Sequence, residues 1–238
     1  MHYDNPAAAL QSILERGAAE KGDQPCHAVW QRILNVQGSG QAELLEKLGL
    51  VMNLPRRTLD LVRTSFPSQI KNTELWTGQI EAAFLNQHLA GQWATFAGQI
   101  TPHCIAHLSL TAELIQTRFA SKLLEEEDLA RLLESLSQLI VDIDNSQLEP
   151  GLRAYLAREL AELQHCIRNY KITGAVPALR QTEALMGHSL LDPQYSSFLT
   201  NHELGTRLLE NLSAMANLLT VAVSLPQLTQ NLGSLLLR

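Results

Sequence analysis

The chain has 238 residues, of which 45% are hydrophobic and 18% are charged, and this composition excludes a wholly disordered chain. Its 24 acidic and 18 basic residues give a formal net charge of −6, which disfavours nucleic acid as a partner. Three cysteines are too few and too widely spaced for a disulfide framework. The first residues lack the basic start and the apolar run of a secretory signal, so we expect a cytoplasmic location.

Leucine dominates the apolar residues, with 45 Leu against 11 Ile and 8 Val. Leucine keeps much of its rotamer freedom in a helix, whereas β-branched residues favour strands. The sequence also lacks the sustained alternation of apolar and polar residues that a half-buried strand needs. We therefore expect an all-α fold, an irregular bundle of many helices.

Helix start and stop signals divide the first 120 residues into short helices. The clearest start is Asn5, a typical N-cap, followed by Pro6 at the first helical position, and we expect this helix to end near Gly17. Apolar spacing and breaks at glycine and proline predict the remaining helices, over about 25–37, 44–52, 55–66, 76–97 and 102–119.

Two long helices are predicted next, over about 125–145 and 150–171. In both of them leucine and isoleucine recur at i, i+3, i+4 and i+7, the spacing of one helix face. Because only a short loop separates them, we expect these helices to form a central antiparallel hairpin. A shorter helix is predicted after Gly174, over about 175–186.

The sequence also predicts a division into domains. Residues 188–203 show no helical period and contain Ser189, Asp192 and Pro193, which favour turns. We therefore predict a helical bundle domain over residues 1–187, a linker over 188–203 and an apolar C-terminal helical segment over 204–238.

A short signature connects the second long helix to the next one. It comprises Leu152-Arg153 and, later, Ile167-Arg168-x-Tyr170-x-Ile172-x-Gly174-Ala175. This segment resembles a recurring one in a family of uncharacterised bacterial all-helical proteins, over about residues 28–187. The resemblance implies a bacterial, mostly helical protein, and it carries over no functional residue because the family has no assigned activity. Independently of this resemblance, Gly174 permits a positive φ at a helix end.

Each cysteine stands next to a histidine, a pattern that raises the question of a metal site. Thiolate and imidazole bind zinc, and two of the histidines lie one helical turn apart. Adjacent helical residues point about 100° apart, however, and the sequence has no Cys-x-x-Cys pair. We therefore expect core cysteines, no metal ion and no cofactor. The candidate ligands to be tested are Cys26, His103, Cys104, His107 and Cys166.

Arg158 and His165 lie seven residues apart on the second long helix, and therefore on one face. This spacing resembles the arginine–histidine arrangement of helical ribonucleases that dimerise to assemble an active site. The resemblance implies that the arginine would stabilise developing phosphate charge and that the histidine would transfer protons. Glu159 departs from this pattern, because a carboxylate repels phosphate. Signatures of hydrolases and nucleotide-binding proteins are absent, so we expect no catalytic residue.

The most unusual feature is a run of 27 residues without charge, from Asn211 to Leu237. Ten of these residues are Asn, Gln, Ser or Thr, and Pro226 interrupts the run, so a conventional membrane anchor is disfavoured. The run is expected either to form two short helices that pack on the protein or a partner, or to insert into a membrane as an oligomer. The expected contact positions are Leu218, Leu219, Val221, Leu225, Leu228 and Leu232.

From these features we expect a protein without catalysis that acts through contacts, with a protein partner or by self-association into an oligomer. Only the family resemblance and the missing enzyme signatures suggest a regulatory or bacterial defence-system role. Two alternatives stay open: a membrane-acting effector that uses residues 204–238, and a ribonuclease of the Arg158/His165 type.

Overall fold

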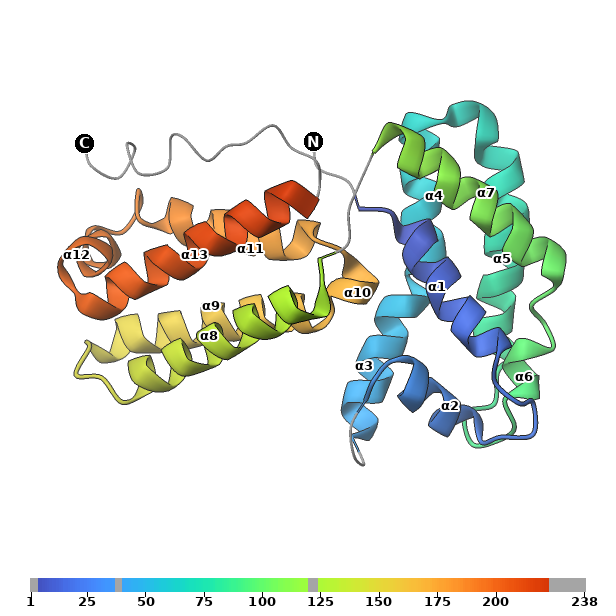
Figure 1. Ribbon diagram of the computed structural model, residues 1–238, viewed down its shortest axis with the longest axis horizontal. Helices are drawn as coiled ribbons and strands as arrows, with labels where there is room; N and C mark the ends of the chain where they lie inside the picture. The colour runs from blue at the N-terminus through green and yellow to red at the C-terminus, as the bar shows by residue number, and fades with distance from the viewer. Residues whose placement is uncertain (1–3, 37–39, 120–123, 223–238) are drawn as a thin grey trace. The chain divides into compact units, whose positions relative to one another are not determined.

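The computed structural model describes residues 4–36, 40–119 and 124–222. Within these ranges the regular elements are helices and no strand occurs, which confirms the predicted all-α fold (Figure 1). The chain divides into two compact units, which we describe separately. The N-terminal unit comprises residues 5–120, and the C-terminal unit comprises residues 1–4 and 121–238.

The N-terminal unit consists of short helices around an aromatic core. These helices are α1 (Pro6–Ala18), α2 (Cys26–Ile33), α3 (Gln41–Met52), α4 (Leu54–Ser65), a 3-10 turn (Pro67–Gln69), α5 (Ile70–Asn86), α6 (Ala94–Ala97) and α7 (Pro102–Arg118). Both α1 and α5 pack against α4 and α7. In the core the Trp30 ring lies 4.9 Å from the Phe96 ring and 5.0 Å from the Trp93 ring, between centroids. The Trp93 indole N–H donates to the Gly17 carbonyl at 2.9 Å, so a large buried side chain keeps its polar group satisfied.

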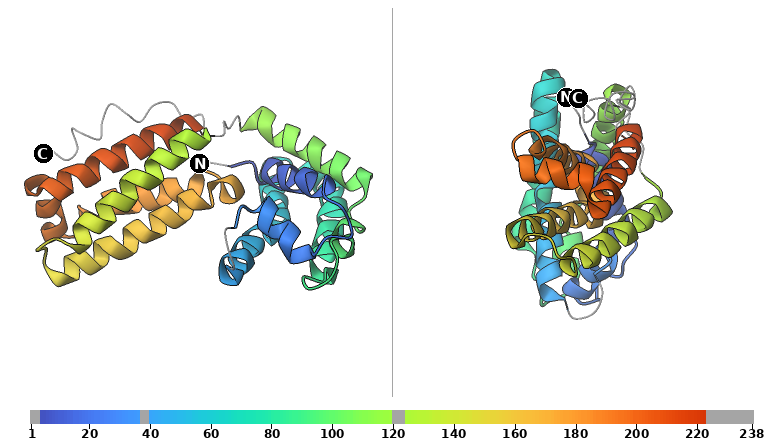
Figure 2. Two further views of the ribbon diagram at one scale, coloured as in Figure 1. Left: turned by 60° about the horizontal axis from the view of Figure 1, so that its bottom comes forward. Right: turned by 90° about the vertical axis from the view of Figure 1, so that its left-hand side faces the viewer.

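The C-terminal unit contains the two long helices. Its helices are α8 (Glu126–Asp144), α9 (Pro150–Arg168), α10 (Tyr170–Thr173), α11 (Val176–His188), α12 (Pro193–Asn201) and α13 (Glu203–Ala222). The first two pack against each other along their length on either side of a short loop, α11 packs against α9, and α13 packs against α8, α11 and α12 (Figures 1 and 2). Leu136, Leu139, Leu156, Leu160 and Leu163 are fully buried where these helices meet. The i, i+3, i+4 leucine stripes therefore form the core of this unit.

Several helix ends follow directly from the sequence signals. The Asn5 side chain accepts from the Ala8 N–H at 3.0 Å, with Pro6 in the first turn, which confirms the predicted start of α1. Gly174 has φ +81° and ends α10, which confirms the predicted positive φ. The carboxylate of Asp4, near the start of the sequence, binds the backbone just after Gly174, because its Oδ1 atom accepts from the Ala175 N–H at 2.7 Å.

The structure divides the chain differently from the predicted domains. The predicted linker over 188–203 contains α12, whose Tyr195, Phe198 and Leu199 are buried. The same residues that favour a turn also begin a helix here, since Asp192 accepts from the Gln194 N–H at 2.8 Å and proline follows it. Residues 204–222 form most of α13, whereas residues 223–238 of the predicted C-terminal segment lie outside the described residues.

Candidate functional site

The structure does not gather the candidate metal ligands into one site. Cys26, Cys104 and Cys166 are buried, whereas His103 and His107 are exposed on α7. Burial raises the pKa of the Cys104 and Cys166 thiols to about 11, so these thiols stay protonated near pH 7 and are poor ligands or nucleophiles. No group of three or more His, Cys, Asp or Glu side chains within the described ranges is placed to hold a metal ion.

Arg158 and His165, the two residues of the ribonuclease hypothesis, contact separate sets of side chains. The Arg158 guanidinium lies 5.6 Å from the centroid of the Tyr155 ring and donates to the Glu159 carboxylate at 2.6 Å. His165 is half-buried one helical turn before Asn169, whose amide nitrogen lies 3.2 Å from its Nε2 atom. The charge of Arg158 is thus paired by the residue that departs from the ribonuclease pattern.

Three rings from three helices form a cluster that the sequence analysis did not foresee. The Tyr155 ring of α9 stacks on the His188 ring of α11 at 4.4 Å, and the Tyr195 ring of α12 lies 5.6 Å and 5.1 Å from them. Asp192 Oδ2 lies 3.5 Å from His188 Nε2. The spacing of His188 and Asp192, one helical turn apart, is the only local signal for this cluster.

Most polar groups around this ring cluster already have partners. Burial would raise the pKa of Glu159, but hydrogen bonds from Arg158 and Gln181 outweigh burial and lower it. The N–H group of Tyr195 is the largest cause of the lowered pKa of Asp192. The Tyr195 hydroxyl, by contrast, is buried and has no hydrogen-bond partner among the described residues. The ring cluster therefore packs α9, α11 and α12 against one another inside the C-terminal unit.

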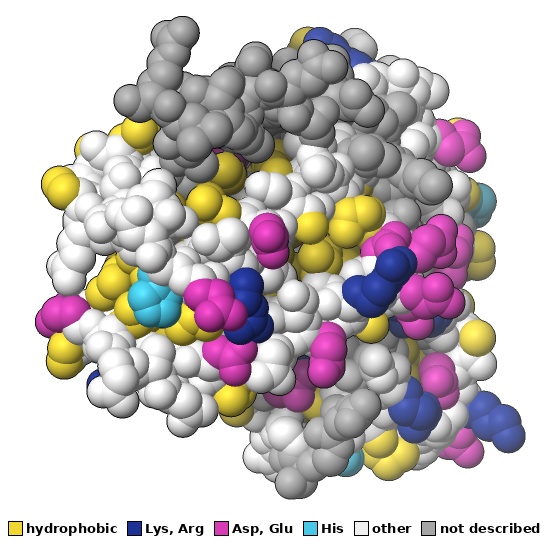
Figure 3. Space-filling view, turned by 60° about the vertical axis from the view of Figure 1, so that its left-hand side comes forward, with side chains coloured by type: hydrophobic (Ala, Val, Ile, Leu, Met, Phe, Trp, Pro, Cys, Tyr) yellow, Lys and Arg dark blue, Asp and Glu magenta, His cyan; other side chains and the backbone are white. Residues whose placement is uncertain are grey.

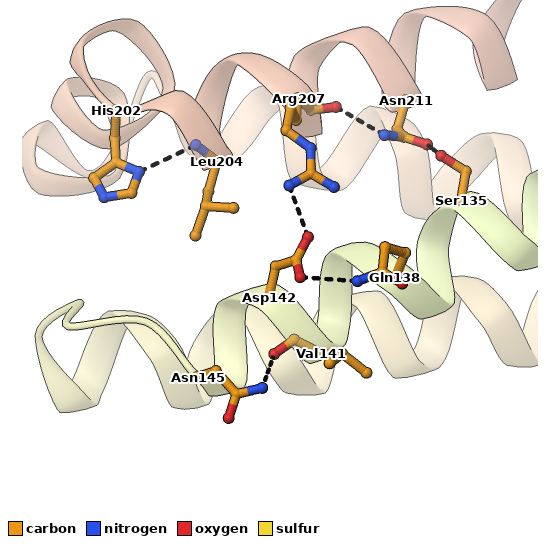
Figure 4. A network of polar contacts seen from close by, with 9 residues as sticks. All are labelled: Ser135, Gln138, Val141, Asp142, Asn145, His202, Leu204, Arg207 and Asn211. Carbon is orange, nitrogen blue, oxygen red and sulfur yellow. Dashed lines mark hydrogen bonds and ion pairs between the residues drawn. The ribbon is translucent and has the colours of Figure 1, made fainter.

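A row of polar contacts joins α8 to α13 (Figure 4). Arg207 Nη1 lies 2.7 Å from Asp142 Oδ2, and the Gln138 amide donates to the other oxygen of this carboxylate at 2.9 Å. Hydrogen bonds from Arg207 and then Gln138 lower the pKa of Asp142. Further along, the Ser135 hydroxyl donates to the Asn211 side-chain oxygen. These contacts fix the position of α13 along α8.

The apolar face of α13, beside this row of polar contacts, belongs to the core of the C-terminal unit. Leu208, Leu212 and Met215 are fully buried and Leu219 is 1% exposed. Of the predicted contact positions, Leu219 is therefore used inside the unit, and Leu218 is half-buried against the same core. The side chain of Val221 and the residues Leu225, Leu228 and Leu232 lie outside the described part of the structure.

Acidic, basic and hydrophobic side chains are mixed on the face that Figure 3 shows. Two adjacent leucines, Leu190 and Leu191, are 78% and 83% exposed between α11 and α12. Each helix within the described residues is too short or too polar to cross a lipid bilayer. No family model, no curated protein and no solved structure matches the chain.

Proposed function

We propose that the chain acts through protein–protein contacts rather than by catalysis, and that residues 223–237 are the contact segment. The observation that carries this proposal is the anchoring of α13. Its first uncharged residues, including Leu212 and Met215, are buried in the core, and Asn211 is bonded to α8. The uncharged run therefore continues from a helix that is fixed in its unit.

A second copy of the chain is the partner that the composition of this segment favours. Residues 223–237 contain six leucines and no charged residue. Two copies of a segment that carries charges of one sign repel each other, whereas two copies of an uncharged segment do not. Their Asn, Gln, Ser and Thr side chains can hydrogen-bond between copies. We therefore take self-association as the form of contact.

Sedimentation equilibrium of the full chain tests this proposal. We expect a mass that is a multiple of 26.4 kDa for the natural sequence. Replacing Leu225, Leu228 and Leu232 together by Gln should return the mass to that of one chain. Replacing the exposed Leu75, Leu85 and Leu190 together by Gln is the matched control, because these leucines lie outside the segment, and this variant should assemble like the natural sequence.

Two results would count against self-association. A natural sequence that sediments as a single chain at about 100 μM would remove it, because the segment would then be too weak for a specific contact. Flotation of the chain with phosphatidylcholine vesicles, abolished by the triple leucine variant of the segment, would instead assign the same segment to a lipid surface.

A further inference from the structure

A histidine caps the first turn of α13. α12 ends at Asn201 and α13 begins at Glu203, so His202 is the residue between them. The Leu204 backbone N–H donates to His202 Nδ1 at 3.1 Å (Figure 4). Helices usually have Ser, Thr, Asp or Asn at this position, with an oxygen that accepts the same kind of bond. A histidine can replace them only while its Nδ1 atom carries no proton.

We propose that His202 is a proton-responsive cap, which holds the first turn of α13 at neutral pH and releases it in acid. In the protonated imidazole both ring nitrogens are donors, so the Leu204 N–H loses its acceptor. The new positive charge also lies at the positive end of the helix dipole, where it is unfavourable.

The neighbouring charges do not supply a replacement acceptor. Glu203 follows His202 directly, but the acceptor of the Leu204 N–H is His202 Nδ1 and not the Glu203 carboxylate. The next charges, Arg207 of α13 and Asp142 of α8, are paired with each other at 2.7 Å. α12 contributes the uncharged Phe198 ring, 5.4 Å from the His202 ring. The hydrogen bond is therefore lost on protonation whatever these charges do to the titration.

The other end of α12 responds differently and serves as an internal reference. There the cap is a carboxylate, since Asp192 Oδ1 accepts from the Gln194 and Tyr195 N–H groups at 2.8 Å and 3.2 Å. His188 lies against this carboxylate at 3.5 Å, so its protonation adds an attraction and removes no acceptor. Acid is thus expected to loosen the start of α13 and to leave the start of α12 in place.

Amide exchange measured by NMR on the full chain at about pH 8 and about pH 5.5 tests the proposal. Two variants set the limits: His202→Asn keeps an uncharged acceptor at both pH values, and His202→Ala has none. After correction for intrinsic exchange, Leu204 in the natural sequence should match His202→Asn at pH 8. At pH 5.5 it should exchange about fivefold faster and match His202→Ala, the size of a typical N-cap contribution. The Tyr195 amide should not change.

Two outcomes would overturn the proposal. One is a Leu204 exchange rate that keeps the same ratio to that of His202→Asn at both pH values. The other is a His202 ring that carries its proton on Nδ1 at pH 8, which its 15N chemical shifts would reveal without any variant. Because assembly enters only through the proposed contact segment, a failure of self-association leaves this test unaffected.

Discussion

Gly205 lies directly against the carbonyl group of Phe198, where α13 turns back over the end of α12. A Cβ atom on this glycine would lie 2.7 Å from the carbonyl carbon and 2.8 Å from the Cα atom of Leu199. Both neighbours are backbone atoms, which cannot move aside as a flexible side chain does. This close approach requires glycine for steric reasons alone.

Gly205→Ala should therefore lower the free energy of unfolding by about 3 kcal/mol, because the added methyl group would push α12 and α13 apart. Urea unfolding followed by circular dichroism gives this number. Gly187→Ala is the matched control, since a Cβ atom there meets nothing within 4 Å, and it should change stability by no more than about 0.5 kcal/mol. An equal effect of both substitutions would contradict the steric explanation.

The effects of substituting Asp4 and Gly174 on stability should be coupled, because the two residues meet at the start of α11. Asp4→Ala removes the acceptor of the Ala175 and Val176 N–H groups and should cost about 1 kcal/mol, as for a lost N-cap. Gly174→Ala should cost more, because φ is +81° and the new Cβ atom would overlap the Asp4 carboxylate. In the double variant the overlap is gone, so its loss of stability in urea unfolding should be smaller than the sum of the losses in the two single variants. Simple additivity would mean that these residues do not meet.

Two buried tyrosines should respond oppositely to removal of their hydroxyl groups. Tyr195→Phe removes a buried hydroxyl that has no partner in the described part of the chain, so the free energy of unfolding should stay the same or rise by up to about 1 kcal/mol. Tyr170→Phe removes the acceptor of the Leu124 N–H, and it should cost about 1 kcal/mol. Thermal and urea unfolding of both variants, side by side, provide the comparison. A large loss in Tyr195→Phe would show that the hydroxyl has a partner, such as an ordered water.

The Asp142–Arg207 pair predicts a specific dependence on acid. The pKa of Asp142 is lower in the folded chain than in the unfolded one, so its contribution is fully present above the ordinary value of 3.8 and is lost as the pH falls through the folded value. Asp142→Asn should therefore be less stable than the natural sequence at pH 6, and the difference should shrink below about pH 4. High salt should reduce it as well, since the pair is partly exposed. Unfolding curves at pH 6 and pH 3 decide this prediction.

Periodic features of the sequence were sufficient for the fold class and for the long helices of the C-terminal unit. Their leucine stripes have one period from end to end, so local spacing determines them. Asp192-Pro193 suggested a linker over 188–203 because these residues favour a turn as much as a helix start, whereas here they begin α12, whose Tyr195 is buried. Leu219, one of the expected contact positions of the uncharged run, packs in the core of its own unit.

Contacts between distant residues were beyond sequence reasoning. Tyr155, His188 and Tyr195 form one cluster only because α9, α11 and α12 pack together, and no spacing along the chain records this. The sequence showed that Gly174 permits a positive φ, but its neighbour Asp4 stands 170 positions earlier. The role of His202 as a cap depends on which ring nitrogen faces the Leu204 N–H, a detail of geometry that the sequence leaves open.

The peptide bond between Asp4 and Asn5 joins two capping residues that serve different units. Asn5 begins α1, and Asp4 holds the start of α11. A gene cut once between the units would therefore yield a fragment 121–238 that lacks its own cap. Fragment studies of the C-terminal unit should supply the missing carboxylate, either as a short peptide in trans or by grafting an acidic residue ahead of α11.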